Sequence, residues 1–474
     1  MGLRTGLAIL TIALSLMLTM AFCLPALAEA EADPEPIKIG LLYDRSWLFK
    51  YYGDMALNGF WYGIEYATNG TWKVLDRPIE LVVGDTAGNP ETASSEAERL
   101  ILEEGVDILV GCCSSACAMA VQDVAKEYEK IFMVAPAAAA EITGSHFNVY
   151  TFRTASTTWH DALTGAKWAV HNLGKKFAFI APDYSWGYST VATWTAVIGA
   201  EGGSVVAVEY APLGTTDFVP YLQRIRDKHP DVLVPVWAGT GTLELFSTIF
   251  SMGLHLEMNI TSGIGDLLGL QLLGQYVLNY TGMCKYGHAL PSNPCNDWLV
   301  SRWRSDYPDK LPYPSAYLPP VPDLFVASPF AAAQAIVYAI KEAGSTDAAA
   351  LIWALEGLEF LSPKGMMYIR PEDHQALMEM YIAKVINDTS TGYPFYGTSW
   401  ILRPELVEVV PRDECAPPID PYPPTVERPE RPAPPTPPPP FWETYGPWIT
   451  AGLGVAVVAA IGISAFMYLR KPRP

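Results

Sequence analysis

Cysteine and histidine are the residues of this chain best suited to catalysis or metal binding, and the 474 residues include seven of each. No HExxH, GxSxG, Walker A or CxxC motif is present, and no histidine is paired by motif with a nucleophile. The Gly239-Thr240-Gly241 sequence lacks the third glycine of a dinucleotide-binding loop. We therefore expect no enzyme activity, no cofactor and no catalytic residue.

Disulfides are the expected role of the cysteines. Six of them lie beyond residue 28, at Cys112, Cys113, Cys117, Cys284, Cys295 and Cys415. An even number in an oxidising compartment predicts disulfide pairs, and Cys284 with Cys295, closing a short loop, is the best pair. Pairing among the other four stays open. A zinc site is the alternative, but neither a CxxC pair nor a nearby histidine supports it.

Ser114 and Ser115 stand just before a predicted helix at 116–128. Unpaired N–H groups and the helix dipole at such an N-terminus suit a bound anion. An ordinary helix N-cap is the alternative interpretation of the same serines.

The elements that must position these residues alternate between short apolar strands and amphipathic helices. Strands are predicted at 37–43, 80–84, 106–111 and 131–135, with helices near 55–67, 90–104 and 116–128 between them. The alternation restarts with a helix at 158–171 and continues to residue 262. Strands separated by helices of this length indicate parallel sheets covered on both faces. The sequence therefore predicts an α/β fold of two Rossmann-like lobes, with a ligand in the cleft between them.

The two ends of the chain predict a membrane-anchored protein. Residues 1–28 resemble a cleaved secretory signal peptide, with an uncleaved anchor as the alternative. A proline-rich stalk is predicted at 416–447, because 13 of the 25 residues at 416–440 are proline. An uncharged apolar span at 448–469 is long enough for a transmembrane helix. Basic residues in the tail, 470–474, place the C-terminus in the cytoplasm and the folded domain outside the cell.

The surface chemistry fits an extracellular domain. The net charge of −19 argues against a nucleic-acid partner, which needs a basic face, and is explained by solubility alone. Four sequons place candidate glycosylation sites at Asn69, Asn259, Asn279 and Asn387.

The order of short motifs along the folded region resembles the type I periplasmic binding proteins, specifically the branched-chain amino-acid-binding (leucine-binding) family of ABC transporters. The resemblance runs from about residue 37 to about residue 402. Its motifs are Tyr52-Gly53-Asp54, Asp85 with Asn89-Pro90, Gly111 with Ser114-Ser115, Pro136-Ala137-Ala138, Phe152-Arg153-Thr154, Trp186-Gly187, Phe325-Val326, and 365–369 followed by Asp373 and Gln375. The C-terminal stalk and anchor resemble those of archaeal surface binding proteins.

The resemblance implies a clamshell of two lobes joined by a hinge, with chain segments exchanged between them. Lobe one is expected to combine 36–153 with 284–361, and lobe two to combine 154–283 with 362–415. Ligand binding closes such lobes by favouring the closed state.

The resemblance also implies a ligand-binding site. By that analogy Ser114 and Ser115 bind a carboxylate, Ala137 offers a backbone carbonyl to an ammonium group, and Tyr52 and Phe325 wall the pocket.

The remaining expected site positions depart from the family pattern. Trp186 stands where a tyrosine is usual, a second expected tyrosine falls near Trp237 or Ala238, and Ala139 replaces a threonine. The expected acidic residue falls on Ile264, with Asp266 nearby as the substitute ammonium partner. A missing hydroxyl and a displaced carboxylate weaken the case for an α-amino acid, while tryptophans near the mouth suit an apolar or aromatic ligand.

The function implied is the substrate-binding subunit of an ABC importer, held outside the membrane and loading a branched-chain amino acid or a related apolar or aromatic molecule. Its partners would be a permease with two membrane subunits and two cytoplasmic ATPases. A ligand-sensing surface receptor with the same clamshell is the main alternative, and an adhesion protein that uses the fold as a scaffold is a further one.

Overall fold

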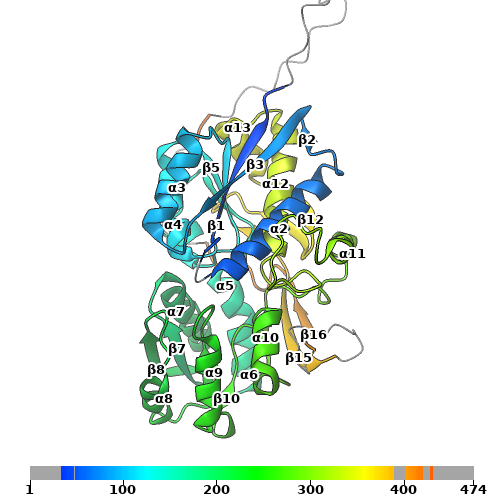
Figure 1. Ribbon diagram of the computed structural model, residues 1–474. Helices are drawn as coiled ribbons and strands as arrows, with labels where there is room; N and C mark the ends of the chain where they lie inside the picture. Colours follow the sequence, from blue (N-terminus) through cyan, green and yellow to red (C-terminus); the bar gives the residue numbers. More distant parts are fainter. Residues whose placement is uncertain (1–33, 47–48, 389–400, 420–427, 431–474) are drawn as a thin grey trace, which may run out of the picture. The chain divides into compact units, whose positions relative to one another are not determined.

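The computed structural model describes residues 34–46, 49–388, 401–419 and 428–430 of the chain. Within these residues the chain forms two α/β lobes, each built on its own largely parallel sheet (Figure 1). The predicted fold class is confirmed for this part of the chain.

Lobe one contains a six-stranded sheet in the order β2-β3-β1-β4-β5-β6. All neighbours are parallel except the short β2, which pairs antiparallel with β3. The strands are β1 (Ile37–Tyr43), β2 (Lys73–Val74), β3 (Arg77–Asp85), β4 (Ile108–Gly111), β5 (Ile131–Val134) and β6 (Thr151–Arg153).

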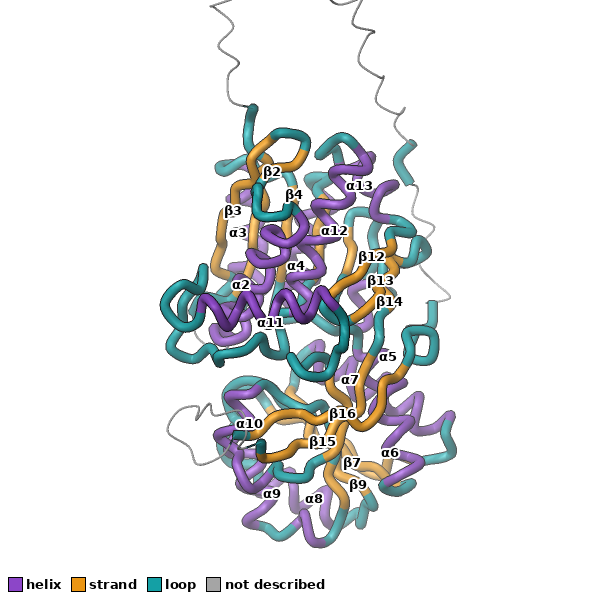
Figure 2. The backbone as a smooth tube through the Cα atoms, turned by 90° about the vertical axis from the view of Figure 1, so that its right-hand side faces the viewer, coloured by secondary structure: helices purple, strands orange, loops and turns teal. Residues whose placement is uncertain are grey.

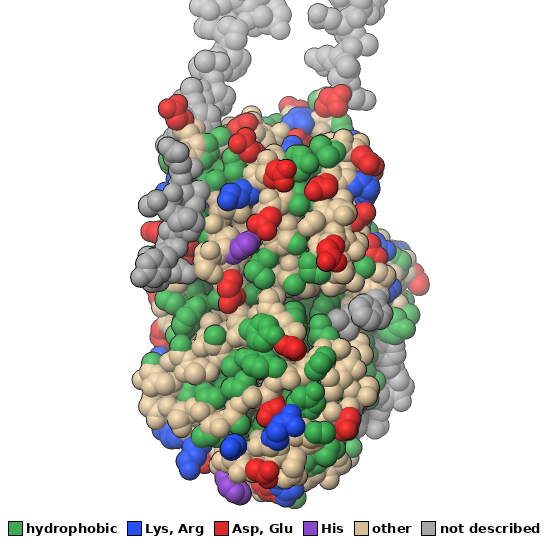
Figure 3. All heavy atoms as spheres, turned by 90° about the vertical axis from the view of Figure 1, so that its left-hand side faces the viewer, with side chains coloured by type: hydrophobic (Ala, Val, Ile, Leu, Met, Phe, Trp, Pro, Cys, Tyr) green, Lys and Arg blue, Asp and Glu red, His purple; other side chains and the backbone are tan. Residues whose placement is uncertain are grey.

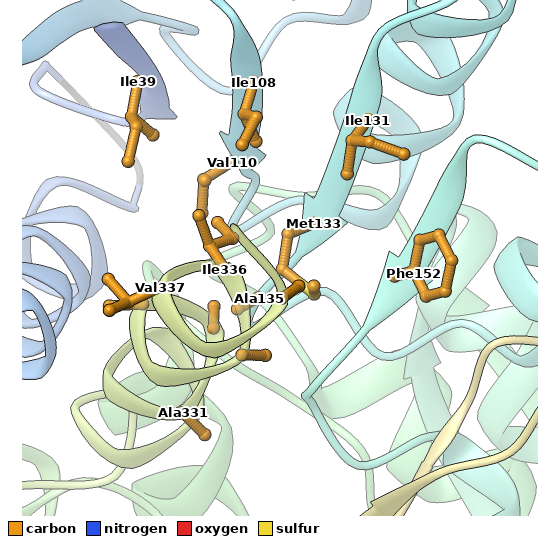
Figure 4. Packing of buried hydrophobic residues seen from close by; sticks show 14 of the residues in the cluster. Ile39, Ile108, Val110, Ile131, Met133, Ala135, Phe152, Ala331, Ile336 and Val337 are labelled. Carbon is orange, nitrogen blue, oxygen red and sulfur yellow. The ribbon is translucent and has the colours of Figure 1, made fainter. Parts of the chain in front are cut away.

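Helices cover both faces of this sheet. One core packs α2 (Lys50–Ala67), α12 (Ala327–Ala343) and α13 (Ala348–Leu355) on the strands, and a second core packs α3 (Pro90–Leu102) and α4 (Ser115–Glu127). Along β1, Ile39 and Leu41 belong to the first core and Leu42 to the second, because successive strand side chains point to opposite faces. Figure 4 shows the first core, with Ile336 and Val337 of α12 turned toward the strands.

Lobe two contains a four-stranded parallel sheet in the order β10-β9-β7-β8. The predicted single helix at 158–171 is instead two short α-helices joined by a π-helical stretch. Its strands are β7 (Lys176–Pro182), β8 (Ser204–Ala211), β9 (Val232–Pro235) and β10 (Asn259–Ile260). Its helices are α5 (Thr158–Asp161), η3 (Ala162–Ala166), α6 (Lys167–Asn172), α7 (Ser185–Ala200), α8 (Val219–Arg226), α9 (Thr242–Ser251), η4 (Leu254–Leu256), α10 (Leu267–Leu273) and η5 (Gly274–Tyr276).

Two small antiparallel sheets extend the lobes. The strands β11 (Thr281–Cys284), β15 (Met380–Asn387) and β16 (Leu402–Val410) form one, joined to lobe two by a bridge between Gly263 and Met283. The strands β12 (Glu359–Ser362), β13 (Gly365–Ile369) and β14 (Ala376–Leu377) form the other, joined to β6 by a bridge between Arg153 and Gln375. The helices η2 (Ala140–Thr143) and α11 (Pro294–Asp306) complete the described elements.

The boundary expected between 361 and 362 is corrected by the placement of these strands. Met367, Ile369 and Met378 pack in the core of lobe one, whereas Met380 and Ile382 pack in a core of lobe two. Figure 2 shows β12 to β14 beside α12, and β15 and β16 beside the strands of lobe two. The chain therefore returns to lobe two between Met378 and Met380, because β13 and β14 pack in the core of lobe one.

A glycine near the start of one helix in each lobe lets that helix approach a strand end. A Cβ atom on Gly53 of α2 would lie 1.9 Å from the Asp44 carbonyl oxygen. A Cβ atom on Gly187 of α7 would lie 2.0 Å from the Pro182 carbonyl oxygen. Only glycine fits at such distances. The preceding aromatic residue is thereby held at the carboxyl edge of each sheet.

The expected Cys284–Cys295 disulfide is wrong. All six cysteines in the described residues are free thiols. Cys284 lies on β11, packs in a lobe-two core and donates to the Tyr286 carbonyl at 3.4 Å. Cys295 lies in the first turn of α11 and packs against α2 and α12 instead, so each thiol is buried in a different core.

The predicted signal peptide, 1–28, and the predicted transmembrane span and tail, 448–474, lie outside the described residues. No helix in the described part of the chain is long and apolar enough to cross a membrane. The beginning of the expected free stalk is bound to lobe one. Arg370 donates to the Pro417 carbonyl at 2.9 Å, and Arg428 pairs with Glu356 at 2.6 Å.

The exposed surface agrees with an acidic, solvated domain. Figure 3 shows acidic side chains spread over one face of the molecule. All four sequon asparagines are exposed, and their glycosylation stays a prediction.

Arg153, at the end of β6, is fully buried at the first crossing between the lobes. Its guanidinium donates to the Gln375 side-chain oxygen at 2.7 Å, to the Ala139 carbonyl at 2.6 Å and to the Thr143 hydroxyl. Gln375 in turn donates to the Ala155 carbonyl at 2.8 Å. Burial lowers the pKa of Arg153 to about 9, so the side chain remains a cation at neutral pH.

Replacing this cation should destabilise the whole fold. We expect Arg153→Met to lower the free energy of unfolding by about 3–5 kcal/mol, because buried acceptors lose their donor. Urea denaturation followed by tryptophan fluorescence measures the change. Arg226→Met is the control, since Arg226 forms an exposed ion pair with Glu257, and should cost less than about 1 kcal/mol. Equal losses in both variants would contradict the role of Arg153.

Candidate ligand-binding site

A cavity of about 120 Å3 lies where the carboxyl ends of the two parallel sheets face each other. Lobe one contributes residues that follow β1, β4 and β5, and lobe two contributes residues that follow β7, β9 and β10. This is the position at which open parallel sheets bind ligands. We call it the interlobe cavity.

Seven of the 22 residues that line the interlobe cavity are aromatic. Tyr52 and Phe325 meet edge to face, with ring centroids 4.7 Å apart. Trp186 lies beside Tyr184, with centroids 6.2 Å apart. The lining also includes Phe49, Trp194 and Trp237. The structure therefore brings together four predicted aromatic residues, Tyr52, Trp186, Trp237 and Phe325, and such rings suit a flat or branched apolar group.

One polar end of the interlobe cavity is the N-terminus of α4. Ser115, the first residue of this helix, lines the cavity, and its hydroxyl oxygen accepts a bond from the Ala139 N–H at 3.1 Å. Ser114 is the N-cap residue but makes no side-chain cap hydrogen bond, and it does not line the cavity. The first-turn N–H groups of a helix have no partner within the helix and attract an anion.

The alanines expected at the site lie behind the wall. Ala137 and Ala139 are buried and do not line the interlobe cavity, whereas Ala138 does. The Ala139 carbonyl already accepts from Arg153, and the Ala138 carbonyl accepts from the Thr158 N–H at 2.8 Å. Backbone carbonyls in this loop therefore hold the hinge together.

Asp161 and Lys285 also line the interlobe cavity, and the motif comparison did not single them out. Their side chains form an ion pair with the Lys285 Nζ atom 3.0 Å from the Asp161 Oδ2 atom. The Asp161 side chain is 2% exposed, and burial raises its pKa. Its Oδ1 atom is buried without a hydrogen-bond partner among the described residues. The sequence does not reveal this pair, because its two members are 124 residues apart and neither lies in a recognisable motif.

Asp44 is a second buried carboxylate that the sequence did not single out. It follows β1 and is fully buried, and neither of its oxygens has a hydrogen-bond partner among the described residues. Burial raises the pKa of Asp44 to about 6, although Thr86 and Cys113 lie close enough to oppose the shift. Cys113 lines the interlobe cavity but Asp44 does not.

Asp266 is committed to structural bonds. Its Oδ1 atom accepts from the Gly269 N–H at 2.7 Å and caps α10, and its Oδ2 atom accepts from the Tyr52 hydroxyl at 3.2 Å. Asp266 lines an adjacent, larger cavity of about 360 Å3, whose wall combines Phe49, Tyr51 and Tyr52 of lobe one with residues of α9 and α10. Asp266 is absent from the lining of the interlobe cavity. Its predicted contact with a ligand ammonium group stays a prediction.

Asp323 forms a second link between the lobes beside Asp266. It accepts from the Tyr51 hydroxyl of α2 at 3.0 Å and from the Leu267 N–H of α10 at 2.8 Å. Burial, together with the nearby Asp266 carboxylate, raises the pKa of Asp323 to about 7. Two buried carboxylates at one helix N-terminus repel each other when both are ionised.

The zinc alternative finds no site in the described residues, which hold no group of three or more histidine, cysteine or acidic side chains arranged for a metal ion.

Comparison with known proteins agrees with this architecture. A family model described as periplasmic binding protein matches residues 36–390. The chain is 29% identical over 383 residues to a Leu/Ile/Val-binding protein homolog of Brucella melitensis, covering 78% of this chain and 92% of the relative.

Solved structures share the fold. A crystal structure of an ABC-type branched-chain amino acid transporter protein from Rhodopseudomonas palustris is 32% identical, with a TM-score of 0.68, and covers 81% of this chain and 99% of its own. A solute-binding protein of an ABC transporter from another strain of that species, in complex with p-hydroxybenzoic acid, is 25% identical, with a TM-score of 0.70. That match covers 80% of this chain and 98% of its own.

The Asp323 link predicts a pH-dependent stability. A carboxyl whose pKa is raised by folding binds a proton more tightly in the folded state, so its contribution to stability falls as pH rises from about 4 to about 7. Asp323→Asn keeps an acceptor oxygen and removes the charge. We expect the variant to exceed the natural protein in free energy of unfolding by at least about 1 kcal/mol at pH 8.

Urea denaturation between pH 5 and pH 8 measures this difference, which should shrink toward pH 5. Asp309→Asn is the matched control, because Asp309 is exposed. A difference that stays constant across the pH range would refute the charge-based account.

Proposed function

The chain belongs to the periplasmic binding protein family, and from that premise we propose that it is the substrate-binding subunit of an ABC importer. In this role it binds a small molecule between its lobes and delivers it to a permease. The observation that carries the proposal is a cavity lined by both lobes, which joins a helix N-terminus to a wall of aromatic rings.

The chemistry of the interlobe cavity supports a small carboxylate with an apolar or aromatic body as the ligand. The carboxylate would accept bonds from the Ser115 hydroxyl and the first-turn N–H groups of α4. The body would lie among Tyr52, Trp186, Trp237 and Phe325. One relative is named as a Leu/Ile/Val-binding protein homolog and one solved structure is in complex with p-hydroxybenzoic acid, and both names fit carboxylates of this general kind. Branched-chain amino acids and aromatic acids are therefore the candidates.

The importer role includes a proposed location. The predicted signal peptide, the span at 448–469 and the basic tail would hold the folded domain on the outer face of the membrane. The expected partners are two permease subunits and two cytoplasmic ATPases. Binding, and no catalysis, is the proposed activity, because the sequence contains no HExxH, GxSxG, Walker A or CxxC motif.

Isothermal titration calorimetry with leucine, valine, benzoate and 4-hydroxybenzoate tests the proposal. We expect at least one to bind, and Ser115→Ala to weaken that ligand about tenfold or more through loss of a hydrogen bond to the carboxylate. Ser95→Ala is the control, because Ser95 lies on the exposed face of α3. No binding by any of the four, or equal effects of both substitutions, would contradict the proposed site.

A further inference from the structure

The Asp161–Lys285 ion pair has unused hydrogen-bonding capacity inside the interlobe cavity. The Asp161 Oδ1 atom is buried and has no partner in the described part of the chain. The Lys285 side chain is 16% exposed, and among the described residues its ammonium group, which can donate three hydrogen bonds, pairs with Asp161 alone. The side chains of Trp194 and Met283, which also line the cavity, carry no acceptor oxygen. A donor and an acceptor therefore stand together in an apolar wall.

The position of the pair in the chain is also unusual. Asp161 is the last residue of α5 and leads into the π-helical stretch η3. Such stretches are rare and are frequent at functional sites. Lys285 directly follows β11, where the chain leaves lobe two. The pair thus joins two of the segments that connect the lobes, and a ligand that touches it contacts the hinge.

The pair is selective by its chemistry. A ligand ammonium group would be attracted by Asp161 but repelled by Lys285, and a second carboxylate would meet the opposite conflict. A neutral hydroxyl satisfies both, because it donates one hydrogen bond and accepts another. A methyl group of the same size would leave both charged groups without that partner. Leaving a buried charged group without a hydrogen bond makes the binding free energy much less favourable.

We propose that Asp161 and Lys285 are specificity-determining residues that bind a neutral hydroxyl group of the ligand. This hydroxyl donates a hydrogen bond to Asp161 Oδ1 and accepts one from Lys285 Nζ. The inference rests on the proposed function, since it assumes that the ligand carboxylate lies at Ser115. It adds that the preferred ligand carries a hydroxyl at the end away from that carboxylate.

Matched ligands that exchange a hydroxyl for a methyl group test the inference in the natural protein. Calorimetry compares 4-hydroxybenzoate with 4-methylbenzoate, and threonine with valine. In whichever class binds, we expect the hydroxyl ligand to bind about tenfold or more tightly. Equal affinity, or a preference for the methyl ligand, would overturn the role of the pair while leaving the proposed function intact. No binding in either class would overturn both.

Substitution of both residues tests whether the preference for the hydroxyl ligand depends on Asp161 and Lys285. We expect Asp161→Asn with Lys285→Met to reduce the hydroxyl preference to less than about threefold while the methyl ligand still binds, since the apolar contacts remain. Glu209→Gln, which breaks the exposed ion pair with Arg224, is the matched control and should keep the full preference. A double variant that keeps the full preference would show the pair to be a structural ion pair only. If the double variant fails to fold, Asp161→Asn alone is measured against the same ligands.

Discussion

The buried guanidinium of Arg153 is the interaction on which the arrangement of the hinge depends. Arg153 is the last residue of the edge strand β6, and its hydrogen bond to Gln375 holds the segment that leads into β14. It also fixes the Ala139 carbonyl, in the loop that supplies the cavity residue Ala138. A cation taken out of water in this way is stable only when its donors find acceptors, so the loop, the strand and the return segment must form together. The geometry of the interlobe cavity therefore depends on the Arg153 charge, although Arg153 does not line the cavity.

The two walls of the cavity depend on the same local feature in both lobes, a glycine near the start of a helix. Gly53 and Gly187 let α2 and α7 begin against the end of a strand, where any side chain would collide with a carbonyl oxygen. The residues before them, Tyr52 and Trp186, are consequently held at the carboxyl edges of the two sheets and line the same cavity. Their conformations are set by backbone packing, which reduces the entropy lost when a ligand is bound between them.

Much of this could be predicted from the sequence, because it depends on local patterns. The apolar strands and intervening helices specified two parallel sheets, and the aromatic–glycine pairs pointed to the cavity walls. The exchange of strands was harder to place. Residues from 362 onward were expected in lobe two, and only the packing of Met367 and Ile369 in the first core shows which lobe they complete. The Cys284–Cys295 pair failed for the same reason, since spacing in the chain carries no information on which core buries each thiol.

The carboxylates illustrate why a site needs the full fold. Asp266 stands nearest in sequence to the expected acidic position, yet each of its oxygens already accepts a hydrogen bond, one from the N-terminus of α10 and one from Tyr52. Neither oxygen of Asp44 has a hydrogen-bond partner in the described part of the chain, but Asp44 does not line the cavity. Asp161 alone among these three combines a free oxygen with a place in the cavity wall. A carboxylate recognises a ligand only through acceptor sites that the protein has left unfilled. The sequence reveals where acids stand along the chain, whereas their remaining hydrogen-bonding capacity is decided by helix caps and cross-lobe contacts that appear only when distant segments meet.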